Sequence, residues 1–312
     1  MSLHRLTSIT VGVPNVAETA AYYTDFGLTP TGPTGLRFAT TDGGEQLEIA
    51  PAPRRRLLQV GLGAQDEDDL GRIASQLNRL DIASARTEAG LTVSDPNSQL
   101  EVTIAVTPEL RQEPAVVEPT NGPGRRDRPD GRAPSIERTN RVRPRKLGHL
   151  VIGSVDQSAT QRFFVEGLGF KISDEVPGLA SFLRCSTDHH NVLVQQAPLN
   201  FLHHTAWEVD DVDEVGRGAS AMIEGHPERH VWGLGRHHIG SNFFWYLRDP
   251  AGNFSEYYSD LDCIVSDALW KPSVVEGARG LYNWGPPPPP SFIQPEDLAA
   301  LMTGSHSPAA AG

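Results

Sequence analysis

The sequence predicts an α+β protein made of two similar modules, because three segments of its first half recur in its second half. RLTSITVGVPNV near the start is similar to KLGHLVIGSVDQ, LQVGLGAQDEDDL to LHHTAWEVDDVDEV, and VSDPNSQLEVT to RDPAGNFSEYY. Similar segments that recur in the same order indicate a duplicated domain.

The repeat divides the chain into four parts. These are a first module at 1–107, a polar linker at 108–145, a second module at 146–262 and a tail at 263–312. TNGPGRRDRPDGRAPS is too rich in Gly, Pro and charge to belong to a core. Five consecutive prolines, Pro286 to Pro290, favour polyproline II over helix or central strand, and we expect the final GSHSPAAAG to be disordered.

The second module begins with an expected strand in LGHLVIGSV. A helix follows in DQSATQRFFVEGLGF, with Asp156 as a candidate N-cap and a stop near Gly167 or Gly169. ASFLRCST and NVLVQQA are expected strands, joined by a turn at Asp188–His190.

A second unit then starts with the strand HHTAWEVDD. The helix Val212–Glu224 is entered through Asp210 or Asp211, and FFWYLRDPAGNFSEYY is a hairpin with its turn at Asp249–Asn253. Each module therefore holds two βαβββ units. The corresponding helices of the first module are expected near Val16–Phe26 and Glu67–Leu80.

Composition and charge exclude several classes of function. A net charge of −12 argues against nucleic acid or an anionic membrane as main partner, and the basic stretches Arg54–Arg56 and Arg125–Lys146 are short. Cys185 and Cys263 are far apart, so we expect reduced thiols in a cytoplasm. No signal core or membrane-spanning apolar run is present, and a homo-oligomer is the general expectation.

Three residues distinguish the second module from the first. His149, His204 and Glu256 align with Ser8, Gln59 and Val102. Two histidines and one carboxylate are the ligand set of a non-haem iron site with open positions. A lone histidine is more often structural, but three such residues that are absent from the other copy favour a metal site. We expect them to point into a cavity lined by aromatic residues such as Phe243, Trp245 and Tyr257.

The motifs GHLVIGSV, LRCSTDHHNVLV, LHHTAWEVDDVDEV and GLGRHHIGSNFFWYLRDPAGNFSEYY resemble those of the type I extradiol catechol dioxygenases of the vicinal oxygen chelate superfamily. The resemblance extends from about Leu6 to Asp262. It implies two modules, each of two βαβββ units that form an open barrel. It also implies a metal in the C-terminal module alone, usually Fe(II) and less often Mn(II).

The resemblance assigns roles to individual residues. His149, His204 and Glu256 match the metal ligands; His204 fits better than the adjacent His203 because it directly precedes Thr205-Ala206. The acid–base histidine matches His190, the residue that contacts substrate oxygen matches His237, and the tyrosine near the metal matches Tyr246. The neighbours His189 and His238 are not expected to take these roles.

Such a set implies insertion of both atoms of O₂ into a substituted catechol, with ring opening beside the two hydroxyls. His190 would move the catechol proton, while Tyr246 and His237 would stabilise charge on substrate oxygen. Arg236 and Arg248 are candidates for binding a substrate carboxylate, although surface roles are equally compatible. Val151 stands where some members carry a polar residue, and Glu45 of the first module aligns with His190.

Two other functions remain compatible with the fold. A glyoxalase-type isomerase or transferase is disfavoured, because such sites draw ligands from paired modules. A non-enzymatic drug-binding protein would leave the three ligands, His190 and Tyr246 unexplained. The choice of catechol, the choice between iron and manganese and the oligomeric state stay open.

Overall fold

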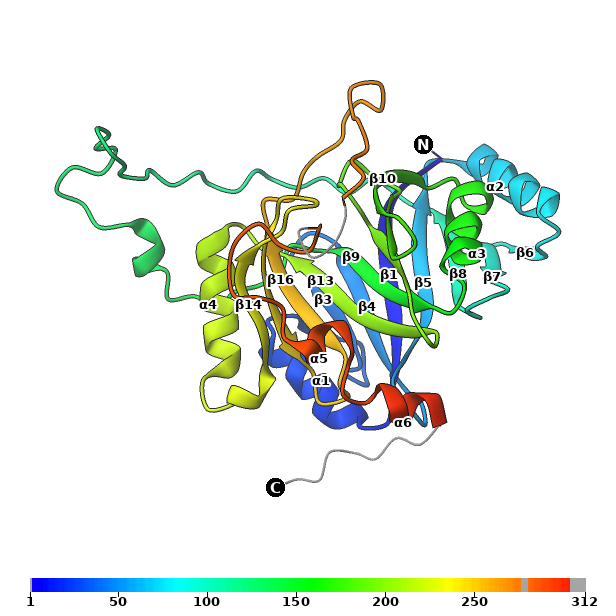
Figure 1. The fold of residues 1–312 in the computed structure, drawn as a ribbon, viewed down its shortest axis with the longest axis horizontal. Coiled ribbons are helices and arrows are strands. Elements are labelled where there is room, and N and C mark those ends of the chain that lie inside the picture. The colour runs from blue at the N-terminus through cyan, green and yellow to red at the C-terminus, as the bar shows by residue number, and fades with distance from the viewer. Residues whose placement is uncertain (1, 276–279, 304–312) are drawn as a thin grey trace.

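The chain forms two eight-stranded sheets, each assembled from two βαβββ units, as the sequence predicts (Figure 1). The computed structural model describes residues 2–275 and 280–303. The first module comprises β1 (Leu3–Val13), α1 (Val16–Asp25), β2 (Thr29–Thr31), β3 (Arg37–Thr40), β4 (Gly44–Pro51), β5 (Arg56–Ala64), α2 (Glu67–Arg79), β6 (Ser84–Thr87), β7 (Gly90–Ser94) and β8 (Glu101–Val106).

The second module repeats this order. It comprises β9 (Lys146–Ser154), α3 (Gln157–Arg162), β10 (Lys171–Val176), β11 (Ala180–Arg184), β12 (Val192–Gln196), β13 (Phe201–Glu208), α4 (Val212–Ile223), β14 (His230–Arg236), β15 (Phe243–Arg248) and β16 (Phe254–Ser259). A π-helical turn, Phe163–Gly167, continues α3 to the expected stop at Gly167.

The two sheets have the same strand order. It is β2-β3-β4-β1-β5-β8-β7-β6 in the first and β10-β11-β12-β9-β13-β16-β15-β14 in the second. At the centre of the second sheet, β9 and β13 run antiparallel, while β13 and β16 run parallel. Three adjacent strands therefore carry the three predicted metal ligands.

Aspartate caps explain where three of the helices begin. Asp66, Asp156 and Asp211 each accept a hydrogen bond from the backbone N–H three residues later, at 2.9 Å. Such a cap satisfies a donor that the first turn of a helix leaves unpaired and stabilises the helix by about 1 kcal/mol. The second helix of the second module, α4, is thus entered through Asp211, one of the two residues considered.

The modules share a continuous core beneath β16. Phe26, at the end of α1, stacks on Tyr257 with ring centroids 3.9 Å apart, and the Tyr257 hydroxyl donates to the Phe26 carbonyl at 2.5 Å. The Tyr22 hydroxyl and Ser255 Oγ lie 2.5 Å apart in the same interface. Because Tyr257 neighbours Glu256, the first module supports the underside of a ligand-bearing strand.

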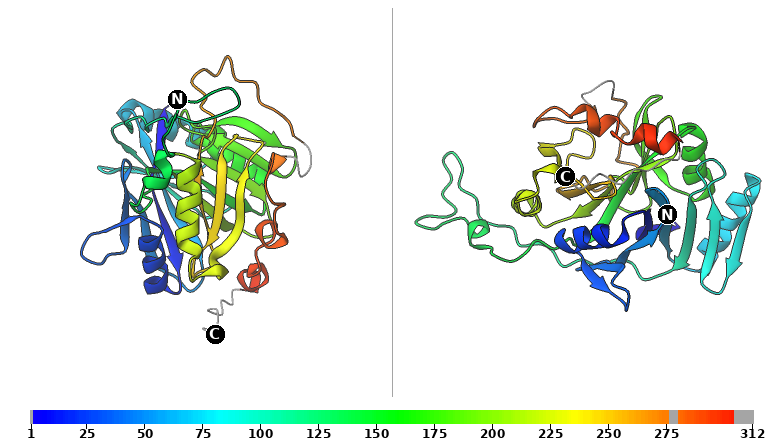
Figure 2. Two further views of the ribbon diagram at one scale, coloured as in Figure 1. Left: turned by 90° about the vertical axis from the view of Figure 1, so that its left-hand side faces the viewer. Right: turned by 90° about the horizontal axis from the view of Figure 1, so that it is seen from below.

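The linker and tail leave the two sheets in different ways. Part of the linker extends away from the body as an arm that contains the 3-10 turn Pro134–Glu137 (Figure 1). The tail returns along the second module through α5 (Pro290–Ile293) and α6 (Leu298–Thr303) (Figure 2). Pro289 has the polyproline II conformation that was expected. Pro290, by contrast, begins α5, because the first position of a helix tolerates proline.

Two further expectations concern the C-terminal end and membrane-spanning segments. The expected disorder of GSHSPAAAG concerns residues 304–312, which lie outside the described residues. Within the described part of the chain, no helix combines the length and apolar character needed to cross a bilayer.

Replacing Phe26 by alanine tests the packing between the modules. We expect the free energy of unfolding to fall by about 3–5 kcal/mol, because a buried ring is lost and a cavity opens against Tyr257. Equilibrium denaturation followed by circular dichroism measures the change. The control Val265→Ala alters a side chain that is 82% exposed and should change stability by less than about 0.5 kcal/mol. Equal effects of the two substitutions would contradict the proposed interface.

Candidate metal centre

Strand register places His149, His204 and Glu256 on one face of the second sheet. Ala206 of β13 is paired with His149 on one side and with Glu256 on the other. His204 lies two residues before Ala206, so alternation directs its side chain to that same face. The side chains of His149, His204 and Glu256, from three adjacent strands, therefore lie close together on one face of the sheet.

The three side chains meet in a buried cluster. Glu256 Oε2 lies 3.2 Å from His149 Nε2 and 3.5 Å from His204 Nε2, and the three possible ligand atoms all lie within 4.8 Å of one another. Ligand atoms about 2.1 Å from a metal and at right angles to one another are about 3.0 Å apart. The donor set and its spacing therefore fit one divalent metal ion that binds on one face and keeps open positions.

Burial keeps the His204 imidazole neutral, which is the form that binds metal. Desolvation holds the pKa of His204 well below its usual value, and the nearby His203 and His149 lower it further. Glu256 is fully buried, and its other oxygen, Oε1, accepts a hydrogen bond from Asn242 Nδ2 at 3.1 Å. A buried carboxylate is costly unless paired or metal-bound, so the cluster favours a cation.

His190 lies directly beside the cluster. Its ring centroid is 4.2 Å from that of His149, and it belongs to the wall of the same cavity. Burial lowers its pKa well below the usual value, with His149 and His189 as further causes. A neutral imidazole in this place can accept a proton.

Tyr246 and His237 form the other side of the site. The Tyr246 hydroxyl lies 2.8 Å from His237 Nε2, and both residues line the cavity. Burial raises the pKa of Tyr246 well above 10, and the charge of Glu256 raises it further. Burial also lowers the pKa of His237. The tyrosine therefore remains a hydroxyl donor and the histidine a neutral partner.

The cavity between these groups is small, about 70 Å³, and mostly apolar. Its walls comprise His149, Val151, Phe182, His190, Leu193, Gln195, His203, His204, His237, Ile239, Tyr246, Gly280, Leu281 and Phe292. The expected aromatic lining of Phe243, Trp245 and Tyr257 is wrong. Alternation along β15 and β16 turns these three to the face opposite Tyr246 and Glu256.

Neither arginine predicted to bind substrate reaches the cavity. Arg236 pairs with Asp260 at 2.7 Å and lies over the ring of Phe243. Arg248 pairs with Glu296 at 2.8 Å. Neither residue belongs to the wall of the cavity, so the structure gives no support to their assignment as substrate ligands.

Registers also test the comparison between the modules. Thr10 pairs with Gln59 as Val151 pairs with His204, and Ser8 pairs with Gly61 as His149 pairs with Ala206. Ser8 and Gln59 thus occupy the positions equivalent to the two histidines. The match of Val102 to Glu256 is wrong by one residue: Gly61 pairs with Thr103, whereas Val102 lies in the core. The turn before β8 differs in length, which motif matching did not detect.

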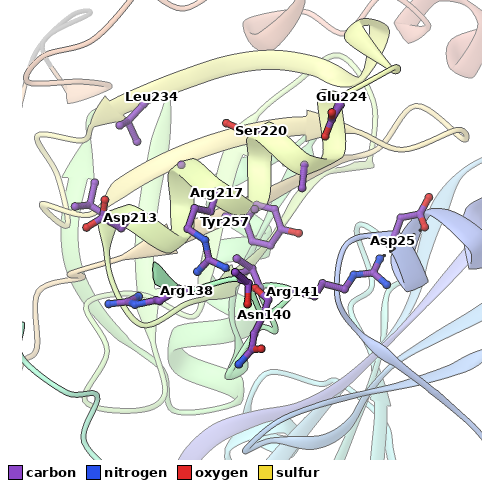
Figure 3. Close-up of a pocket in the computed structure, with 16 residues that line it drawn as sticks. Asp25, Arg138, Asn140, Arg141, Asp213, Arg217, Ser220, Glu224, Leu234 and Tyr257 are labelled. Atoms are coloured by element: carbon purple, nitrogen blue, oxygen red, sulfur yellow. Dashed lines mark hydrogen bonds and ion pairs between the residues drawn. The ribbon is translucent and has the colours of Figure 1, made fainter. Parts of the chain in front are cut away.

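A larger cavity, about 1130 Å³, lies elsewhere, between the linker and α4 (Figure 3). Its arginines are already paired: Arg138 with Asp211 and Glu118, Arg141 with Asp25, and Arg217 with the Asn140 carbonyl. This groove contains none of the three metal ligands. Size alone therefore does not identify the functional site in this chain.

Sequence reasoning missed several residues of the site. Asn242 lies within a quoted motif but was given no role, Phe182 directly precedes another motif, and Leu281 and Phe292 come from the tail. His203 and His189 were set aside as neighbours of functional histidines. Each in fact contacts its neighbour, with Nδ1–Nδ1 distances of 2.8 Å for His203–His204 and 3.0 Å for His189–His190. The repeated His-His pair was the signal that pointed to them.

The two modules have the vicinal oxygen chelate fold, and the candidate metal ligands all lie in the second module. The sequence model of the Glyoxalase/Bleomycin resistance protein/Dioxygenase superfamily matches residues 146–257. This match covers most of the second module and includes His149, His204 and Glu256.

Individual relatives match either nearly the whole chain or about half of it. Metapyrocatechase 2 of Cupriavidus necator is 29% identical over 94% of this chain and 92% of its own. The manganese-dependent 2,3-dihydroxybiphenyl 1,2-dioxygenase of Geobacillus genomosp. 3 is 27% identical over 46% of this chain and 50% of its own. The structure of homoprotocatechuate 2,3-dioxygenase from Arthrobacter globiformis has a TM-score of 0.75 at 16% identity, over 98% of this chain and 95% of that one.

The buried histidines predict acid sensitivity of the metal-free protein. Burial lowers the pKa of His203 to about 4, whereas an unfolded histidine titrates near 6.5. Between these values the unfolded state binds more protons, so the free energy of unfolding falls as pH falls. We expect His203 to contribute up to about 3 kcal/mol of this loss. Denaturation at pH 7 and pH 4.5 measures it, and the loss should be smaller in His203→Gln; an unchanged loss would count against the assignment.

Proposed function

We propose that the chain is an extradiol dioxygenase that opens the ring of a substituted catechol with a divalent metal, iron or manganese, held by His149, His204 and Glu256. The convergence of these three side chains from β9, β13 and β16 carries the proposal. Relatives described as iron-dependent and as manganese-dependent extradiol dioxygenases support both metals.

A metal held by His149, His204 and Glu256 would supply the Lewis acidity and redox chemistry that O₂ activation requires. The chain's own residues supply proton handling and orientation. His190, neutral and beside the cluster, accepts a catechol proton and returns it later. Tyr246, whose hydroxyl lies against His237 in the free protein, turns this single donor to a substrate oxygen as negative charge develops there.

The walls of the cavity favour a flat aromatic substrate. Phe182 and Phe292 provide aromatic faces, while Val151, Leu193 and Ile239 exclude water from the reacting centre. The overall reaction adds both atoms of O₂ to the ring carbon framework and breaks the bond beside the diol. The product is a muconic semialdehyde or its keto analogue.

The metal set argues against the two other functions of this fold. All three ligands come from the second module, whereas a glyoxalase-type site would combine ligands of paired modules. A drug-binding protein would not require a buried carboxylate between two imidazoles.

We propose a reducing compartment, the cytoplasm, and a homo-oligomeric assembly. Cys185 is buried and Cys263 exposed, and both are free thiols. Closed symmetric assemblies are the usual state of enzymes of this size.

Oxygen uptake tests the proposed reaction directly. Protein purified without O₂, loaded with Fe(II) and mixed with a panel of 3-substituted, 4-substituted and bicyclic catechols should consume one O₂ per ring opened. A yellow semialdehyde should form in parallel. Metal-loaded protein that consumes no O₂ with any member of the panel would overturn the proposal.

Replacing His190 by alanine separates proton transfer from metal binding. We expect kcat to fall by about 10²–10⁴-fold, because a positioned acid–base group is lost, while metal content stays at the parent level. The control His238→Ala alters an exposed neighbour and should leave both quantities unchanged. Loss of metal from His190→Ala would instead make His190 a ligand and refute its proposed role.

A further inference from the structure

Three of the four site histidines, His190, His204 and His237, share one feature: each is oriented by a series of hydrogen bonds that leads to the C-terminal segment, of which residues 263–275 and 280–303 are described. We propose that this segment is a positioning part of the metal centre, because it fixes the tautomer and ring orientation of His204, His237 and His190. The inference rests on the proposed function of these residues. It assigns a role to a segment outside residues 146–257, where the superfamily match lies.

The series of hydrogen bonds that orients His204 begins at a backbone carbonyl of the tail. The Phe292 carbonyl can only accept, and it lies 2.6 Å from His203 Nε2, so this nitrogen carries the proton. In neutral His203, Nδ1 then holds a lone pair and lies 2.8 Å from His204 Nδ1, which must donate. The remaining nitrogen, His204 Nε2, therefore presents its lone pair toward Glu256, as a metal ligand must.

A similar series of hydrogen bonds orients His237, but it contains one histidine instead of two. Its Nδ1 donates to the backbone carbonyl of Leu281, again a group that can only accept. Nε2 is consequently the acceptor of the Tyr246 hydroxyl at 2.8 Å. The tail carbonyl thereby fixes the direction in which the Tyr246 hydroxyl points before substrate binds.

The series of hydrogen bonds that orients His190 runs through His189 to Asp174, a side chain that the tail binds. Asp174 Oδ2 accepts from His189 Nε2 at 2.8 Å, and in the tautomer with its proton on Nε2, His189 accepts at Nδ1 from His190 Nδ1 at 3.0 Å. Ser273 of the tail binds Asp174 Oδ1 through its backbone N–H and hydroxyl, and the Trp270 ring packs on His189. His190 Nε2 is left as the nitrogen that can accept a proton.

A buried ion pair fixes the tail in this position. Arg55 of the first module is 1% exposed and donates to both oxygens of Asp297, at 2.5 and 2.8 Å. Its third nitrogen donates to the Leu202 carbonyl at 2.8 Å, one residue before His203. One guanidinium therefore joins the tail to the strand that carries the metal ligand His204. Bidentate pairs of this kind impose geometry as well as attraction.

Substitution of His203 tests the inference without relying on turnover. His203→Phe keeps an aromatic ring but cannot relay the hydrogen bond, whereas a glutamine can accept from His204 and donate to Phe292. We expect His203→Phe to weaken Co(II) and Mn(II) binding by about 10–100-fold and to change the Co(II) absorption spectrum. His203→Gln should restore affinity to within a few-fold of the parent. Parent-like affinity in His203→Phe, or no recovery in His203→Gln, would overturn the inference.

The tail itself is tested by a matched pair of neighbouring carboxylates. Asp297→Asn weakens the buried pair with Arg55, while Glu296→Gln removes an exposed pair with Arg248. We expect weaker Co(II) binding in Asp297→Asn alone, and a similar loss in a chain that ends at Pro289 compared with one that ends at Thr303. Melting temperatures of the apo proteins identify any unfolded variant. A folded chain ending at Pro289 that binds Co(II) as tightly as the parent would refute the inference.

These measurements separate the inference from the proposed function. A parent protein that binds neither Co(II), Mn(II) nor Fe(II) would refute the metal centre itself. A parent that binds metal, with His203→Phe and the shortened chain equally tight, would refute only the role of the tail.

Discussion

The fully buried carboxylate of Glu256 is the constraint on which the rest of the site depends. Asn242 satisfies one of its oxygens, and the other faces the rings of His149 and His204. Burying an ionised group costs several kcal/mol unless a cation or hydrogen bonds compensate it. Because burial also keeps His204 neutral, a divalent ion is the group that best completes the cluster. The central strands of the second sheet, the packing of α1 beneath β16 and the tail all surround this carboxylate.

The duplicated fold shows how one scaffold can carry a site in one copy and support it from the other. Ser8, Gln59 and Thr103 occupy the ligand positions of the first module and provide no imidazole or carboxylate. That module contributes α1 instead, whose Phe26 stacks beneath β16. Strand alternation makes this possible: Glu256 points into the site while the adjacent Tyr257 points into the shared core.

The sequence was sufficient to predict the duplicated βαβββ units and the three residues that the structure brings together as a candidate metal site, because both follow from local patterns and from the contrast between the copies. The sequence was not sufficient where strand register decides which residues correspond or which face of the sheet a side chain occupies. Val102 was matched in place of Thr103, and Tyr257 was placed in the cavity although its neighbour Glu256 already faced it. The role of the tail was also hidden, because its main contacts to the site are the backbone carbonyls of Leu281 and Phe292, which no side-chain motif identifies.

Backbone carbonyls also explain why a proline-rich segment suits this place. Proline retains its carbonyl and has few accessible conformations, so Pro286–Pro290 lose less entropy on ordering than a flexible run would. The Pro286 carbonyl accepts from Trp232 Nε1 at 2.7 Å, and α5 begins at Pro290, two residues before Phe292. A stiff segment held at one end by Trp232 and at the other by Arg55 therefore delivers the Phe292 carbonyl to His203 at low conformational cost. The composition that set the tail apart from the core in the sequence is the property that lets it orient the core's histidines.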